Sequence, residues 1–342
     1  MIHILRKNES LSDIAEIYGV EENELAIYNP NAFLCENSCV WVNSGGIVSF
    51  SESDGSRNTA PFENHEDVRL SAVHTALSCD DGFVPVDKWG RGLSEIFIDS
   101  YRIDPDTKEL VLPYDYPAIN ACIINGLLPS FVITSPVEFC SEEAYNALLT
   151  DLSFKEYQNV MIAAKNLREY EAAVKLGEVL KNDNFGMNLA FSSRILPRVE
   201  DNGLFDMFYY QTEKNIIDFV SFSENILSLT EKFPLLHTGV LYSPGYVDVN
   251  KSDGRVIYAD GKTAKEIFEL SRLSNVKFDD EAQLCYFRYK EKTGTEHTLL
   301  FEDMRSFYAK LSFMLEKGVK NICFWGCDEQ TCVFSKILGL VK

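Results

Sequence analysis

Short runs of hydrophobic residues recur along most of the chain, and stretches with helical spacing of apolar positions separate them. Apolar runs of this length, bounded by polar and turn-forming residues, are typical of strands in a buried parallel sheet. Eight of them occur: VRLSAVHT (68–75), LSEIFIDSYRI (93–103), LLPSFVITSP (127–136), NVMIAAKN (159–166), MNLAFSS (187–193), IIDFVSFSE (216–224), LLHTGVLYS (235–243) and KNICFWGCD (320–328). Strands alternating with helices over residues 67–342 predict an α/β fold, a (β/α)8 TIM barrel.

The pattern changes between the seventh and eighth runs. A helical stretch at 261–273 is followed by two strand-like stretches at 276–291 and 296–303 and by a second helical stretch at 304–318. These elements predict a small α+β insertion after the seventh barrel strand, which could wall one side of a site at the end of the barrel.

The first 50 residues have a different organisation. They predict a strand at 2–7, a helix capped by Ser10 and ended by Gly19, a second helix at 21–31 and a closing strand at 47–50. Residues 51–66 are polar and lack periodicity, which indicates a linker. The chain is therefore expected to hold a small βααβ domain at 1–50 and a barrel at 67–342.

Composition and charge limit the classes of molecule that this chain is expected to bind. The chain has 46% hydrophobic residues, an ordinary globular value, and a formal net charge of −20. This charge opposes binding to nucleic acids and to anionic membranes. The N-terminus lacks a basic region followed by a long apolar one, and no apolar run reaches the length of a membrane span. We expect synthesis in the cytoplasm without a signal peptide.

Cysteine and histidine positions give little support for a metal. Nine cysteines are scattered along the chain, and Cys35/Cys39 and Cys323/Cys327 have CxxxC spacing with no second pair or histidine at zinc spacing. The five histidines are far apart in sequence. We expect buried thiols in a reducing compartment, no metal and no cofactor.

The N-terminal pattern resembles the LysM module. The matching residues are Leu11, Ile14, Ala15, Tyr18, Gly19, Val20, Leu25, Asn29 and Pro30. The sequence departs from the module in having KNES at the first turn and NSGG at a later one. The resemblance implies binding of glycans that contain N-acetylglucosamine, in a groove lined by Asn8, Glu9, Ser10, Asn29, Pro30 and Asn31. Ser10 and Asn29 could equally do no more than cap and turn the chain.

Residues 67–342 resemble glycoside hydrolase family 18 enzymes of the bacterial spore-germination, cortical fragment-lytic type. The most specific likeness is the stretch from FDDEAQ at 278–283 to NICFWGCDE at 321–329, and a LysM module beside such a barrel is a known combination in that family. The family carries Asp-x-Glu on its fourth strand. Here Ala163 takes the place of the Asp and Lys165 that of the Glu.

The family's chemistry needs both acids. The Glu protonates the leaving oxygen, while the Asp orients the 2-acetamido group that attacks the anomeric carbon. An alanine can do neither, and a lysine ammonium is a poor proton donor near neutral pH unless it is strongly desolvated. The family's Met-x-Tyr on the sixth strand is matched only by Ser223, Glu224 and Asn225.

Parts of a sugar site are still expected. By the resemblance Trp325 would form the floor of a sugar subsite, although it could be a core residue. Tyr101, Tyr242 and Tyr246 lie near the ends of predicted strands and are candidates for sugar contacts, and Asp99 and Glu224 are fallback acids. Lys165 would form an ion pair with Glu224 or Asp99, or less expectedly a Schiff base.

These observations predict a catalytically degenerate family 18 pseudoenzyme that binds an N-acetylglucosamine-containing glycan, either peptidoglycan or a chitin-like polymer. The resemblance also implies a bacterial host and a place in the spore cortex or coat. Two alternatives remain open: an active N-acetylglucosaminidase that uses a displaced acid, and an interaction scaffold that binds no sugar.

Overall fold

The structure is a computed structural model of the 342-residue chain. It describes residues 2–4, 10–18, 21–23, 25, 39–41, 68–75, 93–111, 113–212, 219–243, 245–250, 256–258, 270, 276–279, 282–292, 294–302 and 304–325.

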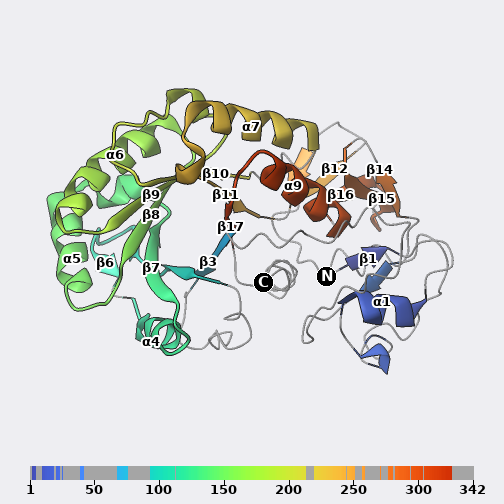
Figure 1. Cartoon of the computed structure of the whole chain (residues 1–342), viewed down its shortest axis with the longest axis horizontal. Helices are drawn as coiled ribbons and strands as arrows, with labels where there is room; N and C mark the ends of the chain where they lie inside the picture. The colour runs from blue at the N-terminus through green and yellow to red at the C-terminus, as the bar shows by residue number, and fades with distance from the viewer. Residues whose placement is uncertain are drawn as a thin grey trace.

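Eight parallel strands close into a barrel, as the apolar runs predict (Figure 1). Their order around the ring is β10-β11-β17-β3-β4-β7-β8-β9. The strands are β3 (Arg69–Thr75), β4 (Glu95–Asp99), β7 (Leu128–Ile133), β8 (Asn159–Ala164), β9 (Gly186–Phe191), β10 (Met207–Gln211), β11 (Thr238–Tyr242) and β17 (Asn321–Trp325).

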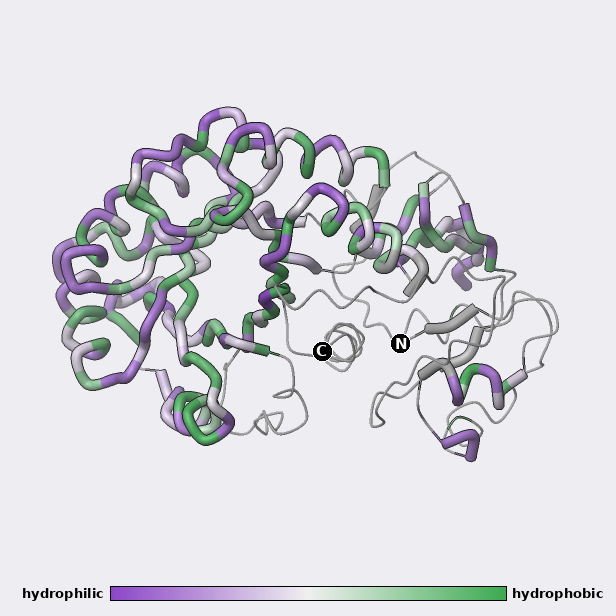
Figure 2. The backbone as a smooth tube through the Cα atoms, viewed as in Figure 1, coloured by the Kyte–Doolittle hydropathy of each residue, from purple (hydrophilic) through white to green (hydrophobic). Residues whose placement is uncertain are grey.

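Helices lie on the outside of the barrel strands (Figure 1). They are α4 (Tyr116–Ile124), α5 (Glu142–Leu152), α6 (Leu167–Asn182), α7 (Phe219–Lys232) and α9 (Met304–Glu316), with short 3-10 turns at Pro136–Cys140, Leu196–Arg198 and Leu235–His237. A two-stranded antiparallel pair, β5 (Arg102–Ile103) and β6 (Leu110–Val111), follows β4. Along α5 and α6, hydrophilic positions alternate with the hydrophobic ones that pack on the strands (Figure 2).

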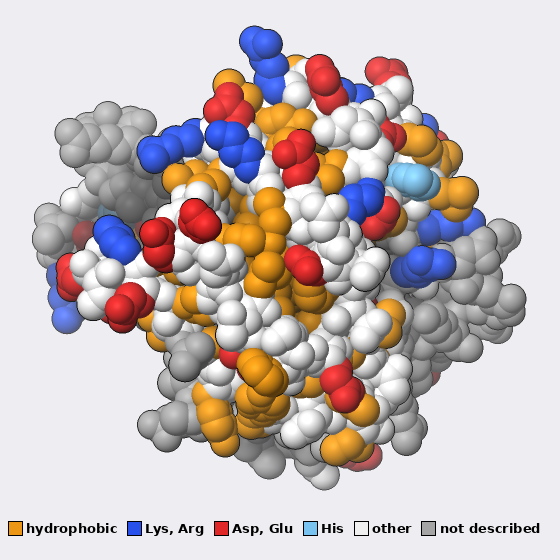
Figure 3. Space-filling model, turned by 90° about the vertical axis from the view of Figure 1, so that its left-hand side faces the viewer, with side chains coloured by type: hydrophobic (Ala, Val, Ile, Leu, Met, Phe, Trp, Pro, Cys, Tyr) orange, Lys and Arg blue, Asp and Glu red, His pale blue; other side chains and the backbone are white. Residues whose placement is uncertain are grey.

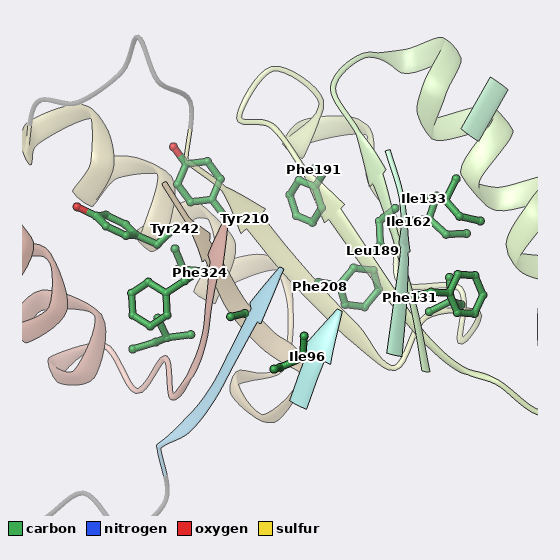
Figure 4. Packing of buried hydrophobic residues seen from close by; sticks show 14 of the residues in the cluster. Ile96, Phe131, Ile133, Ile162, Leu189, Phe191, Phe208, Tyr210, Tyr242 and Phe324 are labelled. Atoms are coloured by element: carbon green, nitrogen blue, oxygen red, sulfur yellow. The ribbon is translucent and has the colours of Figure 1, made fainter. Parts of the chain in front are cut away.

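Strand alternation divides the core of the barrel into two parts. Outward-facing side chains fill the layer between strands and helices, and Figure 4 labels Ile96, Phe131, Ile133, Ile162, Leu189, Phe191, Phe208, Tyr210, Tyr242 and Phe324 among them. Inward-facing side chains form a separate cluster inside the ring: Val73, Phe97, Val132, Met161, Ala163, Ala190, Tyr209, Leu241 and Cys323, with Met207 and Trp325 packed against it.

One predicted barrel strand is wrong. Residues 219–224 of the run assigned to the sixth strand belong to helix α7, and residues 213–218 lie outside the described part. In α7 the buried residues Phe222, Ile226 and Leu229 are spaced by four and three, which places them on one helical face. The sixth strand is β10, whose aromatic run Phe208–Tyr210 favours an extended chain.

The predicted insertion after the seventh barrel strand is confirmed. It contains a five-stranded antiparallel sheet in the order β13-β12-β16-β15-β14, of which β12 and β13 were not expected from the sequence. The strands are β12 (Tyr246–Asn250), β13 (Val256–Tyr258), β14 (Lys277–Asp279), β15 (Leu284–Lys290) and β16 (Glu296–Phe301). Of the helix expected at 261–273, only residue 270 is described, and it is helical.

A buried carboxylate joins the insertion to the barrel. Glu302 follows β16 and accepts hydrogen bonds from the Tyr242 hydroxyl at 2.9 Å and from the Gly245 N–H at 2.8 Å. It also forms an ion pair with Lys310 of α9. Because Glu302 and Lys310 are both buried, this pair fixes strand, sheet and helix against one another.

The N-terminal part is partly described. Strand β1 (Ile2–Ile4) pairs antiparallel with β2 (Cys39–Trp41), and helix α1 spans Leu11–Tyr18. The sequence pattern predicts the closing strand at 47–50, whereas in the described part of the chain β1 pairs with 39–41. Residues 47–50 and the expected linker 51–66 lie outside the described residues, and 22, 23 and 25 of the expected second helix are helical.

The surface over the outer helices carries both signs of charge. Figure 3 shows acidic and basic side chains interspersed on this face, with hydrophobic side chains exposed between them. The most exposed of the large hydrophobic residues on the barrel include Ile124 at 82% and Phe154 at 74%. None of the helices in the described ranges combines the length and apolar character that crossing a bilayer requires.

Candidate functional site

The strand register orders the inward-facing side chains into layers. Ala163 of β8 pairs with Ala190 of β9, which in turn pairs with Tyr209 of β10. Because the strands of a closed barrel are tilted, residues paired in this way lie at successively different heights along the barrel axis. In an eight-stranded barrel this stagger, a shear of about eight residues in total, brings inward positions of alternate strands to one height, four to a layer. The layers follow from the strand register and from the alternation of side chains along each strand.

The layer nearest the carboxyl ends contains four inward positions on β4, β8, β10 and β17. They are Asp99, Ala163, Gln211 and Trp325, and we call them the top layer. Below them lie Val73, Val132, Ala190 and Leu241 from the other four strands, and below those Phe97, Met161, Tyr209 and Cys323. Active sites of TIM barrels form at this carboxyl end, so the top layer is the candidate site.

Ala163 is inside the barrel at this end. Its side chain belongs to the inward-facing cluster and is 0% exposed. The predicted position of the missing aspartate therefore faces the barrel axis, where a side chain could reach a ligand. A methyl group at this point offers neither a charge nor a hydrogen bond.

Lys165 lies one residue beyond β8, and its side chain is exposed. Its backbone is held by the start of α6: its N–H donates to Glu169 Oε2 at 2.7 Å, and the Glu169 N–H donates to Oδ1 of the N-cap Asn166 at 3.0 Å. This arrangement resembles a capping box, except that Glu169 accepts from the N–H of the residue before the N-cap. The Lys165 carbonyl accepts a hydrogen bond from Ser192 Oγ at 3.0 Å. The turn is thus fixed, whereas the ammonium group lies in solvent.

The ion pair expected for Lys165 is not formed. Asp99 is paired instead with Arg102, whose Nη1 and Nη2 lie 2.6 and 2.8 Å from its two carboxylate oxygens. Glu224 is exposed on α7 and lies on no barrel strand. Among the residues that the structure describes, Lys165 has no ion-pair partner, so the prediction of a pair with Asp99 or Glu224 is wrong.

The Asp99–Arg102 ion pair occupies one of the four positions of the top layer. Asp99 is 4% exposed, and the bidentate geometry is the strongest form of a carboxylate–guanidinium contact. Hydrogen bonding to Asp99 raises the pKa of Arg102. Both carboxylate oxygens are therefore engaged by the guanidinium group, and their remaining lone pairs can still accept hydrogen bonds.

Trp325 lies across the barrel from Ala163. β8 and β17 are four strands apart in either direction around the ring of eight, and both residues belong to the inward side. The Trp325 ring packs against the inward-facing cluster and remains partly exposed. A partly exposed aromatic face at the carboxyl end of the barrel can stack on an apolar ring face.

Two of the predicted sugar-contacting tyrosines face away from the barrel axis. Tyr101 is 1% exposed, and its hydroxyl donates to Asp151 at 2.8 Å. Tyr242 is 0% exposed, packs between Phe307 and Phe324 and donates to Glu302. Neither ring has a free face for a sugar, so the structure argues against both contacts.

The remaining predicted residues are placed as follows. Tyr246 begins β12 of the inserted sheet and is partly buried against its core. Ser10 caps α1: its Oγ accepts the Asp13 N–H at 3.1 Å, and its own N–H donates to Asp13 Oδ2 at 2.7 Å. The other predicted groove residues, Asn8, Glu9, Asn29, Pro30 and Asn31, lie outside the described residues.

The sequence did not predict that Tyr209 and Gln211 of β10 face the barrel axis, because the sixth strand was expected at 216–224. β10 contains a Met-x-Tyr sequence, Met207–Tyr209, but the Tyr209 ring lies two positions below the top layer, over Gly239, and its hydroxyl bonds to Ser71. Gln211 is the top-layer residue of β10. Its buried Oε1 has no hydrogen-bond partner among the described residues. The aromatic run before it was the signal for the strand.

The described residues hold no cluster of three or more histidine, cysteine or acidic side chains with metal-binding geometry. Cys323 is buried inside the barrel, where burial raises the pKa of its thiol, and Cys35 and Cys327 lie outside the described ranges.

Comparison with known sequences gives a short match. No protein-family model matches the chain. Over 58 residues, 16% of this chain, it is 38% identical to a cortical fragment-lytic enzyme of Bacillus anthracis, and the match spans only 14% of that relative's length.

Comparison of structures gives matches along almost the whole chain. The spore cortex-lytic enzyme SleL of Bacillus cereus matches with a TM-score of 0.66 at 14% identity, covering 98% of both chains. A family 18 chitinase from Cycas revoluta in complex with (GlcNAc)4 matches with a TM-score of 0.60 at 13% identity, covering 80% of this chain and 99% of the chitinase. The chain therefore has the TIM-barrel fold of spore cortex-lytic enzymes and family 18 chitinases.

Proposed function

We propose that this protein binds a glycan containing N-acetylglucosamine at the carboxyl end of its barrel and does not hydrolyse it. The observation that carries the proposal is the pair of residues at the end of β8: a fully buried alanine at 163 and a solvent-exposed lysine at 165. Neither can protonate a leaving group or steady an attacking acetamide. Trp325, partly exposed across the ring, supplies a stacking face for a sugar.

The fold comparisons support the ligand class. Their names include cortex-lytic enzymes, which act on spore cortex, and a chitinase in complex with (GlcNAc)4. Fold likeness alone does not carry an activity, so the ligand rests on the residues of the top layer together with that likeness.

The N-terminal part fits the same proposal as a second glycan-binding unit. The β1–β2 pair and the capped helix α1 agree with the strand–helix start of a LysM module. Such a module would hold the protein on its polymer while the barrel contacts a single chain, and an attachment to spore cortex or coat follows from the likeness to cortex-lytic enzymes.

Hydrolysis by a displaced acid is the second candidate, and Asp99 is the residue that favours it. Asp99 shares the top layer with Ala163, but its two oxygens are held by Arg102. A proton donor would have to come from a carboxyl free of that pair. Glu224, on the outer helix α7, is not near this layer in the fold.

The test measures binding and turnover on the same samples. Purified protein is titrated with muropeptides and chitooligosaccharides, and released reducing ends are quantified in parallel. We expect saturable binding that Trp325→Ala abolishes, without product release. Product release by the wild type that Asp99→Asn removes would establish the second candidate, and no binding to any of these glycans would favour a scaffold without a sugar site.

A further inference from the structure

The top layer contains a buried polar atom without a partner. Gln211 Oε1 is shielded from solvent and makes no hydrogen bond with any described residue. Burying a carbonyl oxygen without a donor is unfavourable, and native structures leave few such atoms unpaired. The side chain is on the inward face of β10, the face of Met207 and Tyr209, so it points toward the barrel axis.

The other three residues of the layer do not supply a donor. Ala163 has no polar side-chain atom, and Asp99 only accepts hydrogen bonds and is already held by Arg102. The Trp325 indole N–H is a donor, but it is not bonded to Gln211 Oε1. Within this layer no side chain donates to Gln211 Oε1, so the atom is available as an acceptor for a ligand.

We propose that Gln211 is a specificity-determining residue, whose side-chain carbonyl accepts a hydrogen bond from an N–H or O–H group of a sugar stacked on Trp325. This inference rests on the proposed glycan binding and adds which atom recognises the ligand. No described residue donates to this acceptor, and the bound ligand supplies the donor. Binding and stability should then respond in opposite directions to the loss of the amide.

The test uses Gln211→Met, which keeps the length of the side chain but removes its polar atoms. We expect the unliganded variant to gain about 3 °C in Tm, because the orphaned acceptor is gone. We expect its affinity for chitotetraose to fall about tenfold, the loss of one hydrogen bond.

Tyr209→Phe is the matched control. It also removes one polar atom from an inward side chain of β10, but two positions below the top layer, where the hydroxyl is bonded to Ser71. This variant should lose stability and keep the wild-type affinity. A purely structural role of Gln211 would make the two variants behave alike.

A second probe identifies the donor. Cellotetraose has a hydroxyl where chitotetraose has an acetamido group. A tenfold loss for chitotetraose alone assigns an acetamido N–H to Gln211, and an equal loss for both sugars assigns a hydroxyl.

The outcomes separate this inference from the proposed function. If Trp325→Ala abolishes binding while Gln211→Met binds both sugars as the wild type does, the role of Gln211 is overturned and glycan binding stands. If the wild type binds neither sugar, both proposals fail.

Discussion

Restoring the aspartate that the family 18 likeness predicts at position 163 should destabilise the protein. Ala163 is 0% exposed and packs with Met161, Ala190 and the other inward side chains. Three additional heavy atoms in this packed interior cost about 1–3 kcal/mol. Burying a carboxyl without its own donors costs about 1–3 kcal/mol more. Because the two costs are not additive, we expect Ala163→Asp to lose about 3 kcal/mol of the free energy of unfolding.

The loss should depend on pH with a definite sign. Burial disfavours the charged form of the new carboxyl, so its pKa is raised in the folded state. A carboxyl with a raised folded pKa contributes stability that is present below its unfolded pKa and is lost as pH rises through the folded one. The variant should therefore be closer to the wild type at pH 4.5 than at pH 8.

Two control variants isolate the causes. Ala163→Asn adds a side chain of nearly the same size without a charge, so its loss should be smaller at pH 8 and nearly constant with pH. Lys165→Glu changes an exposed residue at the start of α6, where negative charge favours the helix dipole, and should stay within about 0.5 kcal/mol of the wild type. Of the two substitutions that introduce the Asp-x-Glu pair, only Ala163→Asp should then lower the free energy of unfolding appreciably.

Urea unfolding followed by tryptophan fluorescence at the two pH values measures these differences. Equal stability of the Asp and Asn variants at pH 8 would refute the reasoning, because it would mean that water reaches position 163 and solvates the charge. The Ala163 side of the top layer would then be hydrated rather than packed.

Three further predictions concern the groups that hold the barrel. Lys155→Met leaves the carboxylates of Asp115 and Asp151, which it contacts at 2.8 and 2.5 Å, without their cation and should cost about 3–5 kcal/mol in urea unfolding; a loss below about 1 kcal/mol would contradict the buried pairing. Burial raises the pKa of Glu95, so its share of the stability is present at low pH and lost as pH rises, and Glu95→Gln should gain in urea midpoint over the wild type between pH 4.5 and pH 7.5, whereas parallel pH profiles would oppose it. Gly239→Ala would place a methyl carbon 2.5 Å from a tyrosine ring carbon and 2.9 Å from a backbone oxygen, and a loss of about 2 kcal/mol or more in thermal or urea unfolding is expected; an unchanged Tm would show that the strands can move apart.

The fold was predictable where the spacing of apolar residues distinguishes a strand from a helix. Seven of the barrel strands are continuous apolar runs in the sequence, and they appear in the structure near the predicted positions. The sixth was missed because the run at 216–224 is apolar enough for a strand, while its buried residues Phe222 and Ile226 repeat at helical spacing. Burial of one helical face decided the outcome, which a short window of residue types cannot show.

The site was predictable only where the sequence showed which alternate residues of a strand face the barrel axis. Ala163 and Trp325, the two positions taken from the resemblance, both face inward. Tyr242 follows the inward-facing Leu241 by one position, and the period of two therefore turns it outward into the helix layer. Gln211 could not be found from the sequence, because its strand was assigned elsewhere and nothing marks a glutamine as unpaired until the strands are closed into a ring.

The layered interior explains how the barrel can keep its fold while its chemistry changes. Below the top layer the inward positions are packed with Val132, Leu241, Phe97, Met161 and similar side chains, and these contacts stabilise the ring whatever stands above them. Ala163 completes this packing with a methyl group and leaves no buried charge at its position. A barrel with alanine at 163 avoids the cost of a buried charge, while Trp325 remains partly exposed at the same end. The predicted cost of Ala163→Asp is therefore the free energy that alanine at this position spares the folded barrel.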